Sequence, residues 1–116
     1  MALPEQIQNV VETILGVYCF KKVPANVRNE VRLTFFVLGN TVTLFEERLV
    51  NNNLDRGSKL PLAQFRLNVV DHLWRLYYPR PKRQEGWSLY HDAEPTKDFE
   101  AMLTALDDDK TGVFWG

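Results

Sequence analysis

The stretch VRLTFFVLGNTVTLFEE, residues 31–47, decides the fold. β-Branched and aromatic residues fill both of its halves, and residues of these types favour strands. Gly39 and Asn40, between the two halves, form a tight-turn signal. The stretch therefore predicts a β-hairpin with strands at 31–38 and 41–48.

A second run of similar composition follows further along the chain. Residues 62–70 (LAQFRLNVV) and 73–78 (LWRLYY) predict a second hairpin, with a short turn around Asp71 and His72. Residues 86–90 (GWSLY) predict a short fifth strand. Two hairpins and one short strand are typical of an antiparallel sheet.

Both ends of the chain carry apolar residues at helical spacing. The N-terminal stripe begins after Pro4 and consists of Ile7, Val10, Val11, Ile14, Leu15 and Tyr18. The C-terminal stripe follows a capping Thr96 or Asp98 and consists of Phe99, Met102, Leu103 and Leu106. The polar segment 50–60, rich in Asn, Gly and Ser, predicts a mobile loop.

This order of elements predicts one α+β domain over residues 1–116. We expect an antiparallel sheet of about five strands, packed by an N-terminal and a C-terminal helix on one face. The composition fits such a domain, with 45% hydrophobic and 25% charged residues.

The charge balance and the N-terminus argue against several classes of protein. Fourteen Lys and Arg residues face fifteen Asp and Glu, which leaves a formal net charge of −1. This balance argues against a dedicated nucleic-acid coat or a polybasic membrane binder. The N-terminus lacks the pattern of a signal peptide, and no stretch approaches the roughly 18 apolar residues of a membrane span. We therefore expect a cytoplasmic protein without a membrane partner.

One face of the predicted sheet gathers charged and amide side chains. Because side chains alternate along a strand, apolar residues fall on one face and polar residues on the other. The polar face is expected to gain a carboxylate from the pair Glu46 and Glu47, and the planar fork of arginine suits carboxylate or phosphate groups. The alternative is a solvated face with weak cross-strand ion pairs. The ligand-binding candidates are Arg32, Glu46, Arg48, Gln64 and Arg66.

The most basic segment is RLYYPRPKR, residues 75–83. Phosphates pair with Arg and Lys, and unstacked bases stack on aromatic rings, so residues 75–90 form an alternative surface for single-stranded nucleic acid. Lys, Arg and Pro also commonly protect edge strands, which is the plainer explanation. The nucleic-acid-binding candidates are Arg75, Tyr77, Arg80, Lys82 and Arg83.

The remaining reactive residues match no catalytic or metal-binding motif. Cys19 is the single cysteine and adjoins the apolar stripe of the first helix, so a buried structural thiol is expected. Residues 107–112 (DDDKTG) begin like a calcium loop but lack its closing Glu. Gly112 is instead expected to end the last helix in a left-handed cap. His72 and His91 have no partner at metal-ligand spacing. We expect neither a metal nor a cofactor.

Three motifs occur together in this chain: LFEER (44–48), AQFR (63–66) and GVFWG (112–116). In combination they resemble a family of short bacterial proteins known only as a domain of unknown function. The resemblance covers nearly the whole chain. It implies a stand-alone bacterial protein of this length and supplies no reaction, cofactor or substrate.

The leading functional hypothesis is a non-enzymatic binding or adaptor module whose polar sheet face takes a protein or a small anionic ligand. The alternatives are a nucleic-acid-binding accessory protein that uses residues 75–90 and an enzyme with an unrecognised site. A monomer or a weak dimer is expected, because an exposed edge strand permits pairing but does not demand it. The C-terminal Phe114 and Trp115 are expected to fold back onto the core as a structural clasp.

Overall fold

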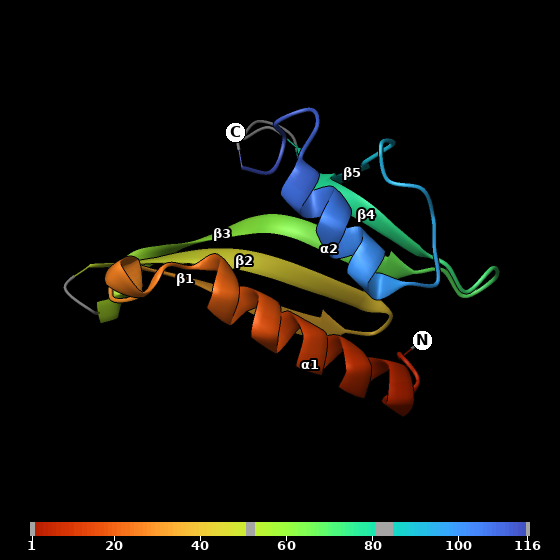
Figure 1. The fold of residues 1–116 in the computed structure, drawn as a ribbon, viewed down its shortest axis with the longest axis horizontal. Coiled ribbons are helices and arrows are strands. Elements are labelled where there is room, and N and C mark those ends of the chain that lie inside the picture. Colours follow the sequence, from red (N-terminus) through yellow and green to blue (C-terminus); the bar gives the residue numbers. More distant parts are fainter. Residues whose placement is uncertain (1, 51–52, 81–84, 116) are drawn as a thin grey trace.

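The computed structural model describes residues 2–50, 53–80 and 85–115, which form an α+β fold (Figure 1). The elements in chain order are helix α1 (Glu5–Lys22), the one-turn 3-10 helix η1 (Ala25–Val27), strands β1 (Val31–Leu38), β2 (Thr41–Val50), β3 (Asn53–Leu67), β4 (Trp74–Pro79) and β5 (Trp87–Leu89), and helix α2 (Phe99–Asp108). The strands pair antiparallel in the order β1-β2-β3-β4-β5, so each lies beside its neighbour in sequence. The predicted fold class is confirmed.

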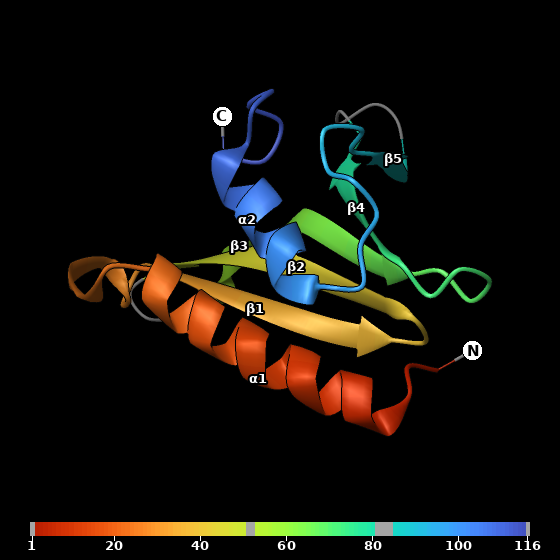
Figure 2. The same cartoon turned by 45° about the vertical axis from the view of Figure 1, so that its right-hand side comes forward.

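Both helices lie on one face of this sheet. α1 runs alongside β1, and α2 lies against β4 (Figures 1 and 2). The apolar face of the strands meets them in one core that includes Leu15, Leu44, Phe65, Leu76 and Leu106. Each of these five side chains is fully buried. The predicted division of the sheet into an apolar and a polar face is therefore correct.

The first hairpin forms as predicted. Gly39 adopts the left-handed φ of 61° that this tight turn requires. The two strands then pair without interruption from Leu38 and Thr41 to Val31 and Arg48. The hairpin therefore fixes the register of β1 against β2.

The mobile loop predicted at 50–60 is wrong for the residues described there. β2 continues to Val50, which pairs with Asn53 at the start of β3. The ladder of backbone hydrogen bonds overrides the poor strand propensity of Asn, Gly and Ser. A bulge in β3 places Leu62 as an extra residue, and this side chain is buried.

Not every predicted core position of the helices is buried. Val11 and Leu15 of α1 are buried, whereas Val10 is 55% exposed. In α2, all four residues of the predicted stripe are buried. Asp98 caps the start of this helix, as expected, and its side chain accepts a hydrogen bond of 3.0 Å from the backbone N–H of Glu100.

The C-terminus folds back against the core. The residue that caps the end of α2 in the left-handed conformation is Asp109 (φ 39°), and Gly112 (φ 71°) turns the chain three residues later, so the predicted cap was misplaced. The Asp109 carboxylate accepts hydrogen bonds from the backbone N–H groups of Phe114 (3.1 Å) and Trp115 (2.8 Å). Local bonding of this kind lets Asp tolerate a conformation that usually favours Gly.

A second aspartate ties this turn to α1. Asp107 accepts a hydrogen bond from the Tyr18 hydroxyl (2.7 Å) and pairs with the Lys22 ammonium (2.9 Å). The Lys22 ammonium also lies 4.7 Å from the centre of the Trp115 ring. These contacts give Asp107 and Asp109 structural roles.

Candidate functional site: the outer face of the sheet

No described helix covers the sheet face opposite α1 and α2, which we call the outer face (Figures 1 and 2). Its members follow from the strand register, because directly paired residues share a face. They include Arg32, Thr34, Phe36, Thr43, Phe45, Glu47, Lys59, Gln64, Arg66, Arg75 and Tyr77. Polar and aromatic side chains from four strands thus share this face.

A buried carboxylate anchors one end of the outer face. Glu47 is only 4% exposed although no described helix lies above it. Its carboxylate accepts hydrogen bonds from the Arg32 Nε (2.6 Å) and the Thr34 hydroxyl (3.1 Å), and the Lys59 ammonium lies 3.8 Å away. Burial by itself raises the pKa of Glu47, but these donors and charges outweigh it and hold the pKa below its usual value. Glu47 is therefore ionised at neutral pH.

A second chain of contacts fixes Arg66. The Gln64 amide nitrogen donates to the Thr43 hydroxyl (3.0 Å), and the Gln64 carbonyl oxygen accepts from the Arg66 Nε (2.6 Å). The Arg66 guanidinium lies over the Tyr77 ring, 4.0 Å from its centre. Arg66 is thus held by its Nε and its planar face, and in the described part of the chain its two terminal nitrogens make no hydrogen bond.

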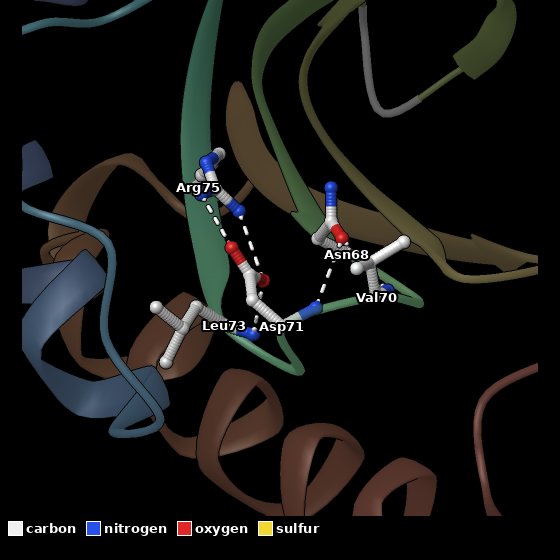
Figure 3. Close-up of polar contacts among 5 residues, drawn as sticks. All are labelled: Asn68, Val70, Asp71, Leu73 and Arg75. Carbon is white, nitrogen blue, oxygen red and sulfur yellow. Dashed lines mark hydrogen bonds and ion pairs between the residues drawn. The ribbon is translucent and has the colours of Figure 1, made fainter.

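Arg75 lies directly opposite Arg66 in the pairing of β3 with β4. Like charges in directly opposed positions destabilise a sheet. Asp71 offsets this repulsion, since its carboxylate accepts hydrogen bonds from both terminal nitrogens of Arg75, at 3.2 and 2.6 Å (Figure 3). The Arg75 bonds lower the pKa of Asp71, and Asp71 in turn raises the pKa of Arg75.

The turn between β3 and β4 holds Asp71 in place. The side-chain oxygen of Asn68 accepts from the backbone N–H groups of Val70 (2.8 Å) and Asp71 (3.2 Å), and Asp71 accepts from the N–H of Leu73 (3.0 Å; Figure 3). Such bonds are the reason that Asn and Asp favour turns. The ion pair with Arg75 is therefore set by local sequence.

The structure separates the ligand-binding candidates into two groups. Arg32, Gln64 and Arg66 lie on the outer face, whereas Glu46 and Arg48 lie on the helix-covered face and pair with each other at 2.8 Å. The carboxylate of the outer face is Glu47. Alternation along β2 could have distinguished the two glutamates. Val42 and Leu44 are buried on the helix side, and residue 46 lies on the same face as they do, whereas residue 47 lies on the other.

The nucleic-acid-binding candidates are divided as well. Arg75 and Tyr77 share the outer face with Arg66. Arg80 instead donates from its Nε to the Ser88 hydroxyl at 3.3 Å, and Ser88 pairs with Tyr78, whose ring packs against Phe114 on the helix side. Lys82 and Arg83 lie outside the described residues. The structure therefore joins members of both candidate sets, Arg66 with Arg75 and Tyr77.

The cysteine thiol and the possible metal-ligand side chains give no further candidate site among the described residues. Cys19 is half-buried, and burial raises the pKa of its thiol to about 11, so the thiol stays protonated at neutral pH. Among the residues that the structure describes, no three His, Cys, Asp or Glu side chains gather where they could hold a metal ion. No helix in the described ranges has the length and apolar character to cross a membrane.

Comparison with known proteins gives one match. The model of a family described as a domain of unknown function (DUF3024) matches residues 3–116. No curated protein matches the chain, and no solved structure does. The site must therefore be interpreted from its own geometry.

Proposed function

The chain belongs to this family of unknown function, and we propose that it is a non-enzymatic binding module whose outer face recognises an anionic group of a protein or a small molecule. The observation that carries the proposal is the fixed guanidinium of Arg66, bonded through its Nε to Gln64 and stacked on Tyr77. Both terminal nitrogens remain as donors for a carboxylate or a phosphate. Because the side chain is already ordered, binding costs little further conformational entropy.

The charge of the site supports an anionic ligand. Arg75 stands directly opposite Arg66, and Asp71 pairs with Arg75 but not with Arg66, so an anion at Arg66 would complete the offset of their repulsion. Charge-assisted hydrogen bonds to guanidinium are also among the stronger polar contacts in proteins. Among the described residues, the site therefore combines an unpaired cation, Arg66, and a paired one, Arg75, with an amide and a ring in a fixed arrangement.

Cations cover two aromatic rings of the outer face, which favours a protein or small-molecule ligand over nucleic acid. The Phe45 ring is covered by the Lys59 ammonium at 4.6 Å, and the Tyr77 ring is covered by Arg66. Bases stack on open ring faces. A single-stranded nucleic acid would have to displace these cations before it could stack on Phe45 or Tyr77, which leaves Phe36, 56% exposed, as an open ring on this face.

Replacing Arg66 by Ala should weaken the binding of inorganic phosphate about tenfold or more, the scale of losing a hydrogen bond to a charged group. The measurement is an NMR titration of the protein with phosphate that follows the Gln64 side-chain amide. Arg48→Ala is the matched control, because it removes one positive charge from the opposite face. Equal losses in the two variants, or no loss in Arg66→Ala, would show that Arg66 is not the anchor.

Asp71→Asn should have the opposite effect and increase phosphate affinity. The substitution removes the negative charge that is bound to the terminal nitrogens of Arg75. The amide oxygen of Asn can still accept a hydrogen bond from the backbone N–H of Leu73. Phosphate then meets two arginines with available terminal nitrogens. The same titration measures this gain, and an affinity at or below that of the unmodified protein contradicts a site between Arg66 and Arg75.

A further inference from the structure

β1 is the first strand in the order of the sheet, and no described strand pairs with its outer edge, which we call the open edge. The two-residue turn makes Leu38 and Thr41 a hydrogen-bonded pair, and the bond from the Leu49 N–H to the Glu30 carbonyl (2.7 Å) continues the same phase at the other end. The even-numbered residues of β1 therefore bond to β2. The N–H and C=O groups that point to the open edge belong to Val31, Leu33, Phe35 and Val37.

This edge has only part of the usual protection: one charged side chain, Arg32, which pairs with Glu47, and α1 alongside it on one face. β1 contains no proline, lysine or bulge, and it pairs with β2 over all eight residues. Natural edge strands are normally short, charged, bent or covered. The opposite edge follows this rule, since β5 has three residues. A long and regular edge whose one charge is already paired is thus characteristic of a strand that pairs with another chain.

Apolar side chains lie on both sides of this edge, among the polar residues Arg28, Arg32 and Thr34. On the helix side, a groove of about 580 Å³ lies between α1 and β1, lined among others by Cys19, Phe20 and Leu33. Gly16 also lines it, and a Cβ atom there would meet no heavy atom within 4 Å. On the outer face, Phe36 is 56% exposed. The groove therefore has room for side chains of an added strand.

We propose that β1 pairs antiparallel with β1 of a second copy of this chain, about a two-fold axis at Thr34. Cross-strand neighbours must share a face, and this register satisfies that condition. It sets Leu33 opposite the second copy's Phe35, and Val31 opposite the second copy's Val37. All four outward-pointing residues of each strand are then paired with one another.

Neighbouring registers do not pair all four outward-pointing residues of each strand with one another. A shift of the axis to Phe35 would pair Val31 with Gly39, whose carbonyl already accepts a hydrogen bond from the Leu3 N–H (3.1 Å). A shift to Leu33 would leave Val37 without a partner inside the strand. The register centred on Thr34 is therefore the self-complementary one.

The side chains also fit a second copy. Leu33 and Phe35 lie on the helix side, so the second copy's Phe35 would stand beside Leu33 at the groove. On the outer face, Arg32 would lie opposite the second copy's Phe36, and Glu47 already offsets the charge of Arg32. No like charges oppose each other, and the two outer faces become one surface.

Cysteine cross-linking tests the register. In a non-hydrogen-bonded antiparallel pair the Cα atoms are about 4.5 Å apart, close enough for a disulfide. In a Cys19→Ala background, Thr34→Cys should form a disulfide-linked dimer with oxidised glutathione, whereas Phe36→Cys should not. Random collision would favour the more exposed position 36. Equal or reversed yields would therefore overturn the proposal.

Sedimentation equilibrium tests the dimer without relying on a cysteine variant. The mass of the unmodified protein should rise with concentration from 13.5 kDa towards twice that value. Phe36→Lys sets two lysines opposite the two Arg32 side chains and should raise the dimer dissociation constant about tenfold or more. Phe36→Glu sets carboxylates there and should preserve the dimer. The proposal would be overturned if the unmodified protein kept the mass of a monomer at concentrations up to about 1 mM. It would also be overturned if Phe36→Lys and Phe36→Glu changed the dimer dissociation constant equally.

Discussion

Replacing Phe114 by Ala should lower the free energy of unfolding by about 3–5 kcal/mol, the range for truncating a buried aromatic residue. Phe114 is 8% exposed although it lies close to the C-terminus. Its ring packs edge-on against Tyr90 (centres 5.0 Å apart) and Tyr78 (6.4 Å). Urea denaturation followed by tryptophan fluorescence measures the loss.

Val113 supplies the matched control for this prediction. It precedes Phe114 and is 38% exposed. Val113→Ala should therefore change the free energy of unfolding by no more than about 0.5 kcal/mol, as is usual at the surface. If Phe114→Ala behaves like Val113→Ala, the C-terminus is not a structural clasp, and its rings become candidates for docking a partner.

The clasp illustrates what could be predicted from the sequence. Two aromatic residues after a glycine indicated that the chain turns back onto the core, because large rings are seldom left in water at a chain end. The turn that brings the rings back to the core could not be predicted. Asp109 adopts a left-handed conformation and binds two N–H groups that follow it, and that arrangement depends on where α2 stops.

The strands show the same division between local and non-local information. Residues 31–48 were predictable because the turn signal and the strand pattern are local. The start of β3 at Asn53 was not, because polar residues become strand there only through pairing with β2. The choice between Glu46 and Glu47 likewise depends on which face each strand buries.

The candidate site was only partly predictable for the same reason. Arginine and glutamine on one sheet face followed from alternation. That Arg66 lies opposite Arg75 follows from the register across the turn at residues 68–73, and the sequence indicated only that such a turn exists. Arg66 and Arg75 were therefore assigned to separate hypotheses, although they are neighbours in the folded chain.

Glu47→Gln should lower the free energy of unfolding at neutral pH by about 1–3 kcal/mol, the cost of leaving buried polar partners incompletely satisfied. Glu47 receives hydrogen bonds from Arg32 and Thr34 and lies near a second cation, Lys59, so a neutral amide cannot replace its charge. Glu46→Gln is the control, because it removes the same charge from the more exposed neighbouring residue (side chain 21% exposed). That variant should lose less stability, within about 1 kcal/mol.

The pH dependence distinguishes the charge of Glu47 from its shape. Its pKa in the folded protein is below the usual value of 4.5, so in acid the unfolded chain binds the proton more readily. The stabilisation from Glu47 is thus complete well above pH 4.5 and is lost as the pH falls through the folded-state pKa. Urea midpoints of the unmodified protein and Glu47→Gln should therefore converge in acid, whereas a constant gap between them would contradict an ionised Glu47.

The same variant separates fold from function on the outer face. Glu47 bonds to Arg32 and Thr34, whereas Arg66 is held by Gln64 and Tyr77, and the two groups share no hydrogen bond in the described residues. Glu47→Gln should therefore lower stability without changing phosphate affinity at temperatures where the protein stays folded. A parallel loss of affinity would extend the anion site from Arg66 to Arg32 and make the whole outer face one binding surface.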